Sequence, residues 1–271
     1  MKEFKDCVAV ITGAASGIGR GIAERCAQEG MKIVLADINE ADLIRVEAEL
    51  KATGAAVISV QTDVAKRSDV EALAQRTLDA FGGVHLLVNN AGVGAGSSVW
   101  DSTWNDWEWV IGVNLWGVIH GVKVFTPIML AQHEECHIVN TSSIAGLIAY
   151  QPSAPYHVTK HAVVALSENL HRSLAEQKAR VKVSVLCPGW VKTQIMSSAR
   201  NRPVGLQDEP APVGPELQAS REARRAAVEA GMSPQEVADQ VFKAIREERL
   251  YILTHPEYTP KIQERIENIL K

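Results

Sequence analysis

Short apolar runs alternate along the chain with longer segments in which apolar residues recur at helical spacing. The short runs are rich in β-branched residues and predict strands. They cover residues 7–12, 32–37, 56–63, 84–90, 136–143, 181–189 and 250–254. The longer segments predict helices at residues 17–30, 40–54, a stretch that ends at 81–83, 103–132, 155–176, 233–248 and from about 257 onward.

Strands that are apolar on both faces and separated by helices are typical of a parallel sheet covered on both sides. The order of elements therefore predicts an α/β fold, a Rossmann-type doubly wound parallel sheet of about seven strands flanked by helices. The chain has 271 residues, of which 46% are hydrophobic, so it can bury a large core. We find no repeat and no dividing linker, and expect a single domain over residues 1–271.

The stretch after the sixth strand, residues 194–232, departs from this alternation. Its first half is rich in Pro and Gly, which prevents regular helix, whereas residues 217–231 are helix-prone. A loop of this length in a compact domain is usually functional or disordered. We expect a lid over the substrate, and we place the basic run at 221–225 on a solvated helix face.

The formal net charge of −4 provides no broad basic field for a nucleic acid or an anionic membrane surface, so we expect neither partner. The four cysteines lie far apart and form no C-x-x-C motif, which is typical of reduced packing residues. The N-terminal residues lack the apolar stretch of a signal peptide, and no uninterrupted apolar run is long enough to cross a bilayer. These features predict a soluble, cytoplasmic protein.

A glycine-rich turn, TGAASGIG, joins the first predicted strand to the first helix and contains Gly13, Gly17 and Gly19. Glycines at this position let the backbone turn tightly and approach a pyrophosphate, whose charge is met by the positive helix end. The spacing differs from G-x-G-x-x-G, and a tight turn without a ligand is the alternative. The preceding strand and the following helix favour a dinucleotide site.

An acidic residue, Asp37, ends the second predicted strand about twenty residues further on. Its carboxylate can accept hydrogen bonds from the ribose hydroxyls of adenosine and would repel a 2′-phosphate. Ser16 and Ile38 stand where basic side chains could have held that phosphate, and both are neutral. The sequence therefore favours NAD over NADP.

A tyrosine and a lysine, Tyr156 and Lys160, lie four residues apart in a predicted helix. Residues at this spacing share a helix face, so the ammonium can sit near the phenol and favour its ionised form. Such a pair could serve as a general acid or base near neutral pH. Taken alone, it could also be a surface Tyr beside a solvated Lys.

Several motifs together resemble the short-chain dehydrogenase/reductase family. They occur in family order and are TGAASGIG at residues 12–19, NNAG at 89–92, NTSSIAG at 140–146, YHVTK at 156–160 and PGWVKT at 188–193. The resemblance covers roughly residues 5–193, and the remaining tail is compatible but less specific. It implies an NAD(P)-dependent oxidoreductase in which the cofactor carries the hydride and the protein moves the proton.

The resemblance also implies a catalytic tetrad. Tyr156 would exchange a proton with the substrate oxygen, and Lys160 would lower its pKa and bind the nicotinamide ribose. Ser143 would hydrogen-bond the substrate oxygen, because family spacing selects it over Ser142, which would support the structure. Asn114 would mark a helix kink that holds a water in a proton relay to the lysine.

Further site residues follow from the same resemblance. The implied cofactor-binding residues are Gly13, Ser16, Gly17, Ile18, Gly19, Asp37, Ile38, Asp63, Val64, Asn90, Ala91, Gly92, Tyr156, Lys160, Pro188, Gly189, Val191 and Thr193. The candidate substrate pocket consists of Val93, Ile144, Tyr150 and Trp190. These residues and the long insertion suggest a bulky, largely apolar alcohol or ketone. Family subunits form a four-helix contact, so the resemblance implies a homo-oligomer, expected to be a tetramer.

Other functions were weighed against this one. A β-ketoacyl reductase of fatty-acid type usually resembles the NADP branch, and Asp37 argues against it. A dinucleotide-sensing protein without catalysis would need the glycine turn but not the complete tetrad. The segment WEWVIGVNLWGVIHG, residues 107–121, is also similar to lignin-type aryl-alcohol Cα-dehydrogenases. The zinc-protease pattern H-E-x-x-H occurs at 133–137, but the second histidine opens a predicted strand, so we expect no metal.

Overall fold

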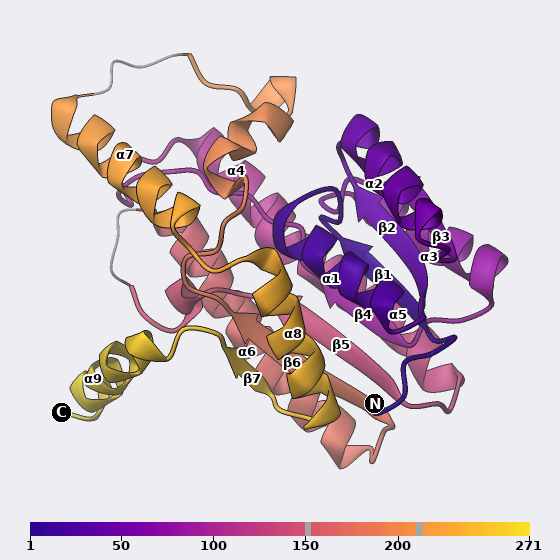
Figure 1. Ribbon diagram of the computed structural model, residues 1–271. Coiled ribbons are helices and arrows are strands. Elements are labelled where there is room, and N and C mark those ends of the chain that lie inside the picture. Colours follow the sequence, from indigo (N-terminus) through magenta and orange to yellow (C-terminus); the bar gives the residue numbers. More distant parts are fainter. Residues whose placement is uncertain (150–152, 210–213) are drawn as a thin grey trace.

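The structure is a computed structural model that describes residues 1–149, 153–209 and 214–271. Within these residues, seven strands form one sheet in which every neighbouring pair is parallel (Figure 1). The strand order is β3-β2-β1-β4-β5-β6-β7, which confirms the predicted doubly wound topology. The strands are β1 (Val8–Thr12), β2 (Lys32–Asp37), β3 (Val57–Gln61), β4 (Leu86–Asn89), β5 (Cys136–Thr141), β6 (Val181–Cys187) and β7 (Tyr251–Leu253).

Helices cover both faces of this sheet (Figure 1). The helices are α1 (Gly17–Gln28), α2 (Glu40–Ala52), α3 (Arg67–Phe81), α4 (Trp104–Ile111), α5 (Gly117–Ala131), α6 (Ala154–Glu176), α7 (Pro215–Glu229), α8 (Pro234–Arg246) and α9 (Thr259–Leu270). Ile22 of α1 and Phe242 of α8 belong to the core on one face. Leu73 of α3 and Phe125 of α5 belong to the core on the other face.

The central strand β1 shows why the strands are apolar throughout. Ala9 and Ile11 lie in the core shared with α1 and α8, whereas Val10 lies in the core shared with α3 and α5. All residues of β1 are buried. Since successive side chains of a strand point to opposite faces, a sheet covered on both sides requires an uninterrupted apolar run.

The helix predicted at residues 103–132 forms in three parts. Thr103 and Asp106 make a capping box at the start of α4, and a π-helical segment, Gly112–Trp116, leads from α4 into α5. The combined helix, Trp104–Ala131, is long and apolar enough to cross a membrane by length and composition alone. Core helices of soluble proteins pass the same test, and Phe125 lies in the core of this domain.

The insertion after β6 contains 3₁₀ turns at Ile195–Asn201 and Val204–Leu206, followed by α7. In Figure 1 this part lies at the upper left, away from most of the sheet. Val191 and Met232 form an isolated parallel bridge, and the Lys192 N–H donates to the Met232 carbonyl at 2.9 Å. Both ends of the insertion are therefore held together at one place.

One helix glycine, Gly121 of α5, makes a close approach to the sheet. A Cβ at this position would lie 2.0 Å from Oδ1 of Asn89 in β4. Asn89 is only 3% exposed, and its Nδ2 donates to Oδ1 of Asn140 at 2.9 Å. The buried amide therefore has little room to move aside, and the spacing between α5 and β4 depends on the absence of a side chain.

We expect Gly121→Ala to lower the free energy of unfolding by about 1–3 kcal/mol, a typical cost of overpacking. This loss should exceed the gain in helix propensity of about 1 kcal/mol that Ala provides over Gly. Gly112→Ala is the matched control, because its Cβ would meet only the Ala65 Cβ at an ordinary 3.5 Å. Urea unfolding of both variants measures the difference, and equal effects would contradict the packing argument.

Candidate active site

The loops that follow β1, β2, β3, β4, β5 and β6 open into one cavity of about 1500 Å³. It includes the point between β1 and β4 where the strand order reverses, which is where doubly wound sheets bind ligands. Drug-sized ligands occupy pockets of roughly 300–1,000 Å³. The cavity is therefore large enough for a dinucleotide together with a second molecule.

The glycine turn forms one wall of this cavity and packs closely on the loop after β4. Gly13 and Gly17 have φ values of 67° and 54°, in the left-handed region that favours glycine. A Cβ on Gly13 would lie 2.8 Å from the Ala91 Cα, and one on Gly19 would lie 2.2 Å from the Gly13 carbonyl oxygen. Only glycine fits at these two closely packed positions, so the backbone of the turn itself lies at the cavity surface.

The amino end of α1 follows directly, and its geometry suits an anion. Ser16 is the N-cap residue, but its side chain makes no cap hydrogen bond. The first N–H groups of a helix lack intrahelical partners, and the helix dipole is positive at this end. Together with the glycine turn, this arrangement fits the pyrophosphate of a dinucleotide.

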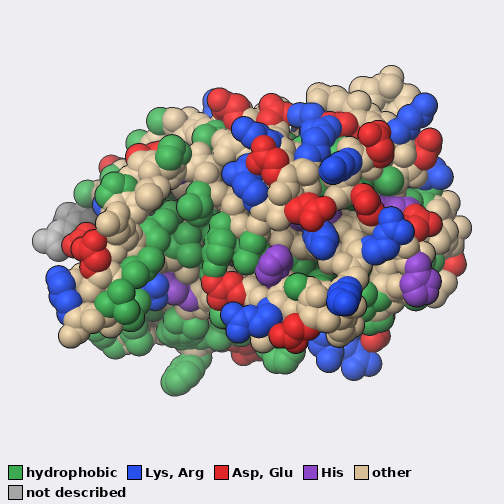
Figure 2. Space-filling model, turned by 90° about the horizontal axis from the view of Figure 1, so that it is seen from below, with side chains coloured by type: hydrophobic (Ala, Val, Ile, Leu, Met, Phe, Trp, Pro, Cys, Tyr) green, Lys and Arg blue, Asp and Glu red, His purple; other side chains and the backbone are tan. Residues whose placement is uncertain are grey.

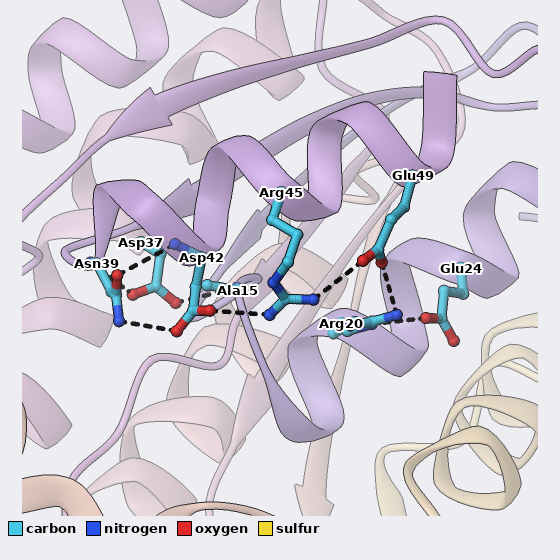
Figure 3. Close-up of polar contacts among 8 residues, drawn as sticks. All are labelled: Ala15, Arg20, Glu24, Asp37, Asn39, Asp42, Arg45 and Glu49. Atoms are coloured by element: carbon cyan, nitrogen blue, oxygen red, sulfur yellow. Dashed lines mark hydrogen bonds and ion pairs between the residues drawn. The ribbon is translucent and has the colours of Figure 1, made fainter. Parts of the chain in front are cut away.

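The carboxylate of Asp37 lies at the end of β2, across from this turn. Its Oδ2 accepts from the Ala15 N–H and its Oδ1 from the Asn39 N–H, both at 3.0 Å (Figure 3). Burial raises the pKa of Asp37, and the backbone N–H groups oppose that rise. Each carboxylate oxygen can accept more than one hydrogen bond, so acceptor capacity remains for ribose hydroxyls.

A row of charged side chains continues from Asp37 along α2 to α1 (Figure 3). Two arginines in this row are already neutralised: Arg45 bridges Asp42 and Glu49, and Arg20 bridges Glu49 and Glu24, at 2.8–3.0 Å. Because their guanidinium groups are engaged with carboxylates, they are poorly available to a 2′-phosphate beside Asp37.

Tyr156 and Lys160, in the first turns of α6, lie on the cavity wall as the sequence predicts. The Lys160 Nζ is 5.4 Å from the centroid of the Tyr156 ring and donates to the Thr141 carbonyl at 2.9 Å. Lys160 is 3% exposed, and this burial lowers its pKa to about 8. The ammonium form therefore still predominates at neutral pH.

The sequence predicts that Lys160 lowers the pKa of Tyr156, and burial of the phenol acts in the opposite direction. Burial raises the pKa of the phenol, and its interaction with the Ser143 hydroxyl only opposes that rise. Burial raises this pKa because a phenolate loses its hydration when it is removed from water. The Lys160 Nζ is 5.4 Å from the centroid of the Tyr156 ring, and it donates its hydrogen bond to the Thr141 carbonyl. The sequence spacing gave the shared face but not the balance between burial and charge.

The two neighbouring serines differ in the way that the sequence suggested. The Ser142 hydroxyl is committed to the Lys160 carbonyl at 2.7 Å and is 1% exposed. The Ser143 hydroxyl accepts from the Ala145 N–H at 3.1 Å and donates weakly to the Pro188 carbonyl at 3.3 Å. Ser143 also interacts with Tyr156, so its hydroxyl and the phenol face the same part of the cavity.

Asn114 lies within the π-helical segment and is fully buried behind the cavity. Its amide exchanges two hydrogen bonds with the backbone of Val93, at 2.8 and 2.9 Å. A Cβ on Gly92 would lie 3.5 Å from the Asn114 Oδ1 and 3.6 Å from the Lys160 Nζ. The asparagine and the lysine thus both border the space next to Gly92, and a π-helical turn lies where the sequence resemblance implies a kink.

Most other predicted residues also border the cavity. The cofactor candidates that line it are Gly13, Ser16, Gly17, Ile18, Asp37, Ile38, Asp63, Val64, Asn90, Ala91, Gly92, Tyr156, Lys160, Pro188, Gly189, Val191 and Thr193. Val93 and Trp190 line it as well, whereas Ile144 is 2% exposed and lies outside the lining, because it is buried in the 3₁₀ turn after Ser143. Tyr150 lies outside the described residues.

Sequence reasoning missed His255, which supports the turn at residues 188–193. Its Nδ1 accepts from the Gly189 N–H, and its Nε2 donates to the Trp190 carbonyl, both at 3.0 Å. A carbonyl can only accept, so the ring carries its proton on Nε2. The signal was absent from the sequence, because more than sixty residues separate the histidine from the turn.

The basic run at 221–225 is largely solvent-exposed, as the sequence predicts, because Arg221 and Arg225 are exposed and Arg224 is half-buried. Sequence reasoning did not show that these three arginines also border the cavity. In the H-E-x-x-H pattern, His133 has a φ of 57° in the turn after α5, and His137 is buried in β5 against the Ser184 hydroxyl. The two histidines therefore do not share a helical face.

Comparison with known proteins shows to which family this chain is similar. A family profile described as short chain dehydrogenase matches residues 7–203. A CLA biosynthesis dehydrogenase/reductase of Lactiplantibacillus plantarum is 36% identical over all of this chain and 95% of its own. A C alpha-dehydrogenase of Sphingobium is 33% identical over all of this chain and 87% of its own.

Solved structures show the same likeness in three dimensions. A short chain dehydrogenase/reductase from Burkholderia phymatum, crystallised in complex with NAD, has a TM-score of 0.96 and 49% identity to this chain. The match covers 99% of this chain and 96% of the Burkholderia chain.

Proposed function

The chain belongs to the short-chain dehydrogenase family, and from this membership we propose that it is an NAD-dependent oxidoreductase that interconverts a secondary alcohol and a ketone. The observation that carries the proposal is the grouping of Ser143, Tyr156 and Lys160 at one cavity, with Asn114 buried directly behind it. A protein that only senses a dinucleotide would not need this grouping.

In the proposed reaction, the substrate oxygen lies between the Ser143 hydroxyl and the Tyr156 phenol. Both groups can donate a hydrogen bond to a ketone, and Tyr156 then supplies or removes the proton. Lys160, held by the Thr141 carbonyl, keeps a positive charge near the phenol and favours the phenolate in the oxidation direction. The bound nicotinamide would accept or supply the hydride.

The residues around the turn fit NAD. The unbonded N-cap at Ser16 and the close-packed glycines suit the pyrophosphate, and Asp37 retains acceptor capacity for the ribose. The relative from Burkholderia was crystallised with this cofactor. The preference for NAD over NADP follows from the charge of Asp37 and from the prior engagement of Arg20 and Arg45.

The proposed substrate has a bulky apolar part. The cavity wall near Val93 includes Trp109, and the two pack with Val110 and the lid residue Leu206. We further propose that the chain forms a single domain and that residues 194–232 act as its lid over the substrate. We also propose that the protein works in the cytoplasm.

We expect Tyr156→Phe to lower kcat by about 10²–10⁴-fold, the usual contribution of a general acid or base. NADH binding should change little, because only the hydroxyl that exchanges the proton is removed. Absorbance of NADH with a panel of secondary alcohols measures the rate, and fluorescence titration measures cofactor binding. A variant that kept more than about a tenth of the rate would exclude the acid–base role.

For the cofactor, we expect kcat/KM to be higher with NAD than with NADP. Asp37→Ala should narrow this difference, since it removes the charge that repels the 2′-phosphate. Asp37→Asn is the matched variant, because it keeps the size of the side chain and removes only the charge. The proposal fails if the unmodified protein uses NADP as well as NAD.

We also propose that the protein is a homo-oligomer, expected to be a tetramer. Figure 2 shows apolar side chains gathered on the left part of the face seen from below, the side on which α9 lies in Figure 1. No residue of α9 is buried, and Ile266, Ile269 and Leu270 are 49%, 66% and 80% exposed. Trp116, the last residue of the π-helical segment, and Val158 of α6 are each 50% exposed.

Light scattering at micromolar protein should therefore give a mass of several 29.5 kDa chains. Self-complementary apolar faces favour a closed symmetric assembly, because association removes them from water. A monomeric mass under these conditions would contradict the proposal.

A further inference from the structure

The face of α7 that borders the cavity is basic. Gln218, Arg221, Arg225 and Val228 follow one another at intervals of three or four residues, so they share one helix face, and all of them line the cavity. Arg224 lies beside this row, also lines the cavity and is half-buried. The only acidic residue of α7 that lines the cavity, among those with described side chains, is Glu222, which accepts from Gln218 at 3.1 Å.

These arginines lack the carboxylate partners that Arg202 of the lid has, and among the described residues Arg224 donates only to the Ser220 carbonyl, at 3.3 Å. Arg202 pairs with Asp106 at 2.8 Å and with Asp208 at 2.9 Å, so its charge is satisfied within the fold. Arg221, Arg224 and Arg225 form no ion pair with any carboxylate whose side chain the structure describes. Burial and the nearby Arg221 both lower the pKa of Arg224, which is what an unsatisfied cation in a partly desolvated place experiences.

The arginines lie at a defined place relative to the reacting groups. The carboxyl end of α7 is fixed to the turn at residues 188–193, because the Met232 N–H donates to the Trp190 carbonyl at 3.0 Å. That turn also accepts from Ser143 through the Pro188 carbonyl. Arg225, Arg224 and Arg221 precede Val228 by three, four and seven residues. At 1.5 Å per residue, they lie about 5–11 Å further along the helix axis.

Part of the cavity wall is apolar, although Asp106, Asp208 and Glu209 also line the cavity. Val93, Trp109 and Leu206 pack together at this wall, and Val228 is buried in α7. A molecule that reaches from Tyr156 to the arginines can therefore contact apolar side chains on its way to the guanidinium groups. Arginine is the side chain best suited to bind a carboxylate, since it can donate two parallel hydrogen bonds.

We propose that the substrate of this enzyme is amphipathic, with the reacting carbon at Tyr156, an apolar body and a carboxylate held by Arg224 and Arg225 of α7. This inference rests on the proposed alcohol–ketone chemistry and adds the class of substrate on which that chemistry acts. The same contact would draw α7 onto the bound molecule, because the anion supplies the partner that the arginines lack within the fold.

A binding experiment tests the inference without requiring turnover. Octanoate and the neutral octan-1-ol are titrated by calorimetry into the NADH-loaded protein and into the double variant Arg224→Gln, Arg225→Gln. We expect octanoate to bind about tenfold or more tightly than the alcohol, and the double variant to lose this difference, since a hydrogen bond to a charged group contributes a factor of this order or larger. Arg224→Lys with Arg225→Lys should retain part of it.

Kinetics then separate the inference from the proposed function. Ketones with a distal carboxylate should be reduced with a higher kcat/KM than their methyl esters, and the double variant should raise KM for the acids without changing KM for NADH. The remote control Arg76→Gln, exposed on α3, should change neither value. Absence of any turnover would refute the proposed function but leave the calorimetric result to judge the arginines.

Two results would overturn the inference. One is equal binding of octanoate and octan-1-ol by the unmodified protein. The other is a double variant whose preference for octanoate persists. If that variant also binds NADH more weakly, the arginines contact the cofactor phosphates instead.

Discussion

The close contact between the ends of β1 and β4 is the constraint on which the site depends. Thr12, the last residue of β1, accepts from the Asn90 and Ala91 N–H groups through its hydroxyl, at 2.9 and 3.1 Å. The Asn90 side chain returns a hydrogen bond to the Thr12 carbonyl at 3.0 Å. These bonds hold the two loops together where the strand order reverses, and Gly13 fits between them only because it has no side chain.

From this contact the cavity extends in two directions, toward Asp37 and toward α7. On the side of β2, Asp37 is fixed by backbone N–H groups, and Arg20 and Arg45 are paired with acidic neighbours. On the side of the insertion, Arg221, Arg224 and Arg225 of α7 border the cavity and form no ion pair with a carboxylate among the described side chains. Lys160 also borders the cavity, and its ammonium group donates to the Thr141 carbonyl. A long molecule bound with one anionic end therefore has one favourable orientation.

Much of the fold was available from the sequence, because its signals are local. Apolar runs predicted the strands, and the glycines at residues 13 and 17 predicted the turn. In the structure both glycines have φ near 60°, which favours glycine. The family resemblance selected Ser143 over Ser142, and the structure places the Ser142 hydroxyl on the Lys160 carbonyl and the Ser143 hydroxyl beside Tyr156. What spacing could not give was the effect of burial, which raises the pKa of the Tyr156 phenol. Nor could it place His255 or the arginines of α7, which reach the site through tertiary packing of distant segments.

The π-helical segment at Gly112–Trp116 sets the rotational phase of the helix that follows it. Each residue of an α-helix turns the chain by about 100°, so a wider turn here decides which side of α5 faces the sheet. On that side Gly121 meets Asn89, while within the segment Asn114 reaches the loop behind the cavity. Deletion of one residue from the segment would rotate the helix after it by about 100° relative to the helix before it. Gly121 and Asn114 could then not both keep their present contacts. The number of residues in this helix therefore fixes how the core contact and the site contact are oriented relative to each other. An insertion or deletion within the helix would disturb one of them, whereas a substitution need not.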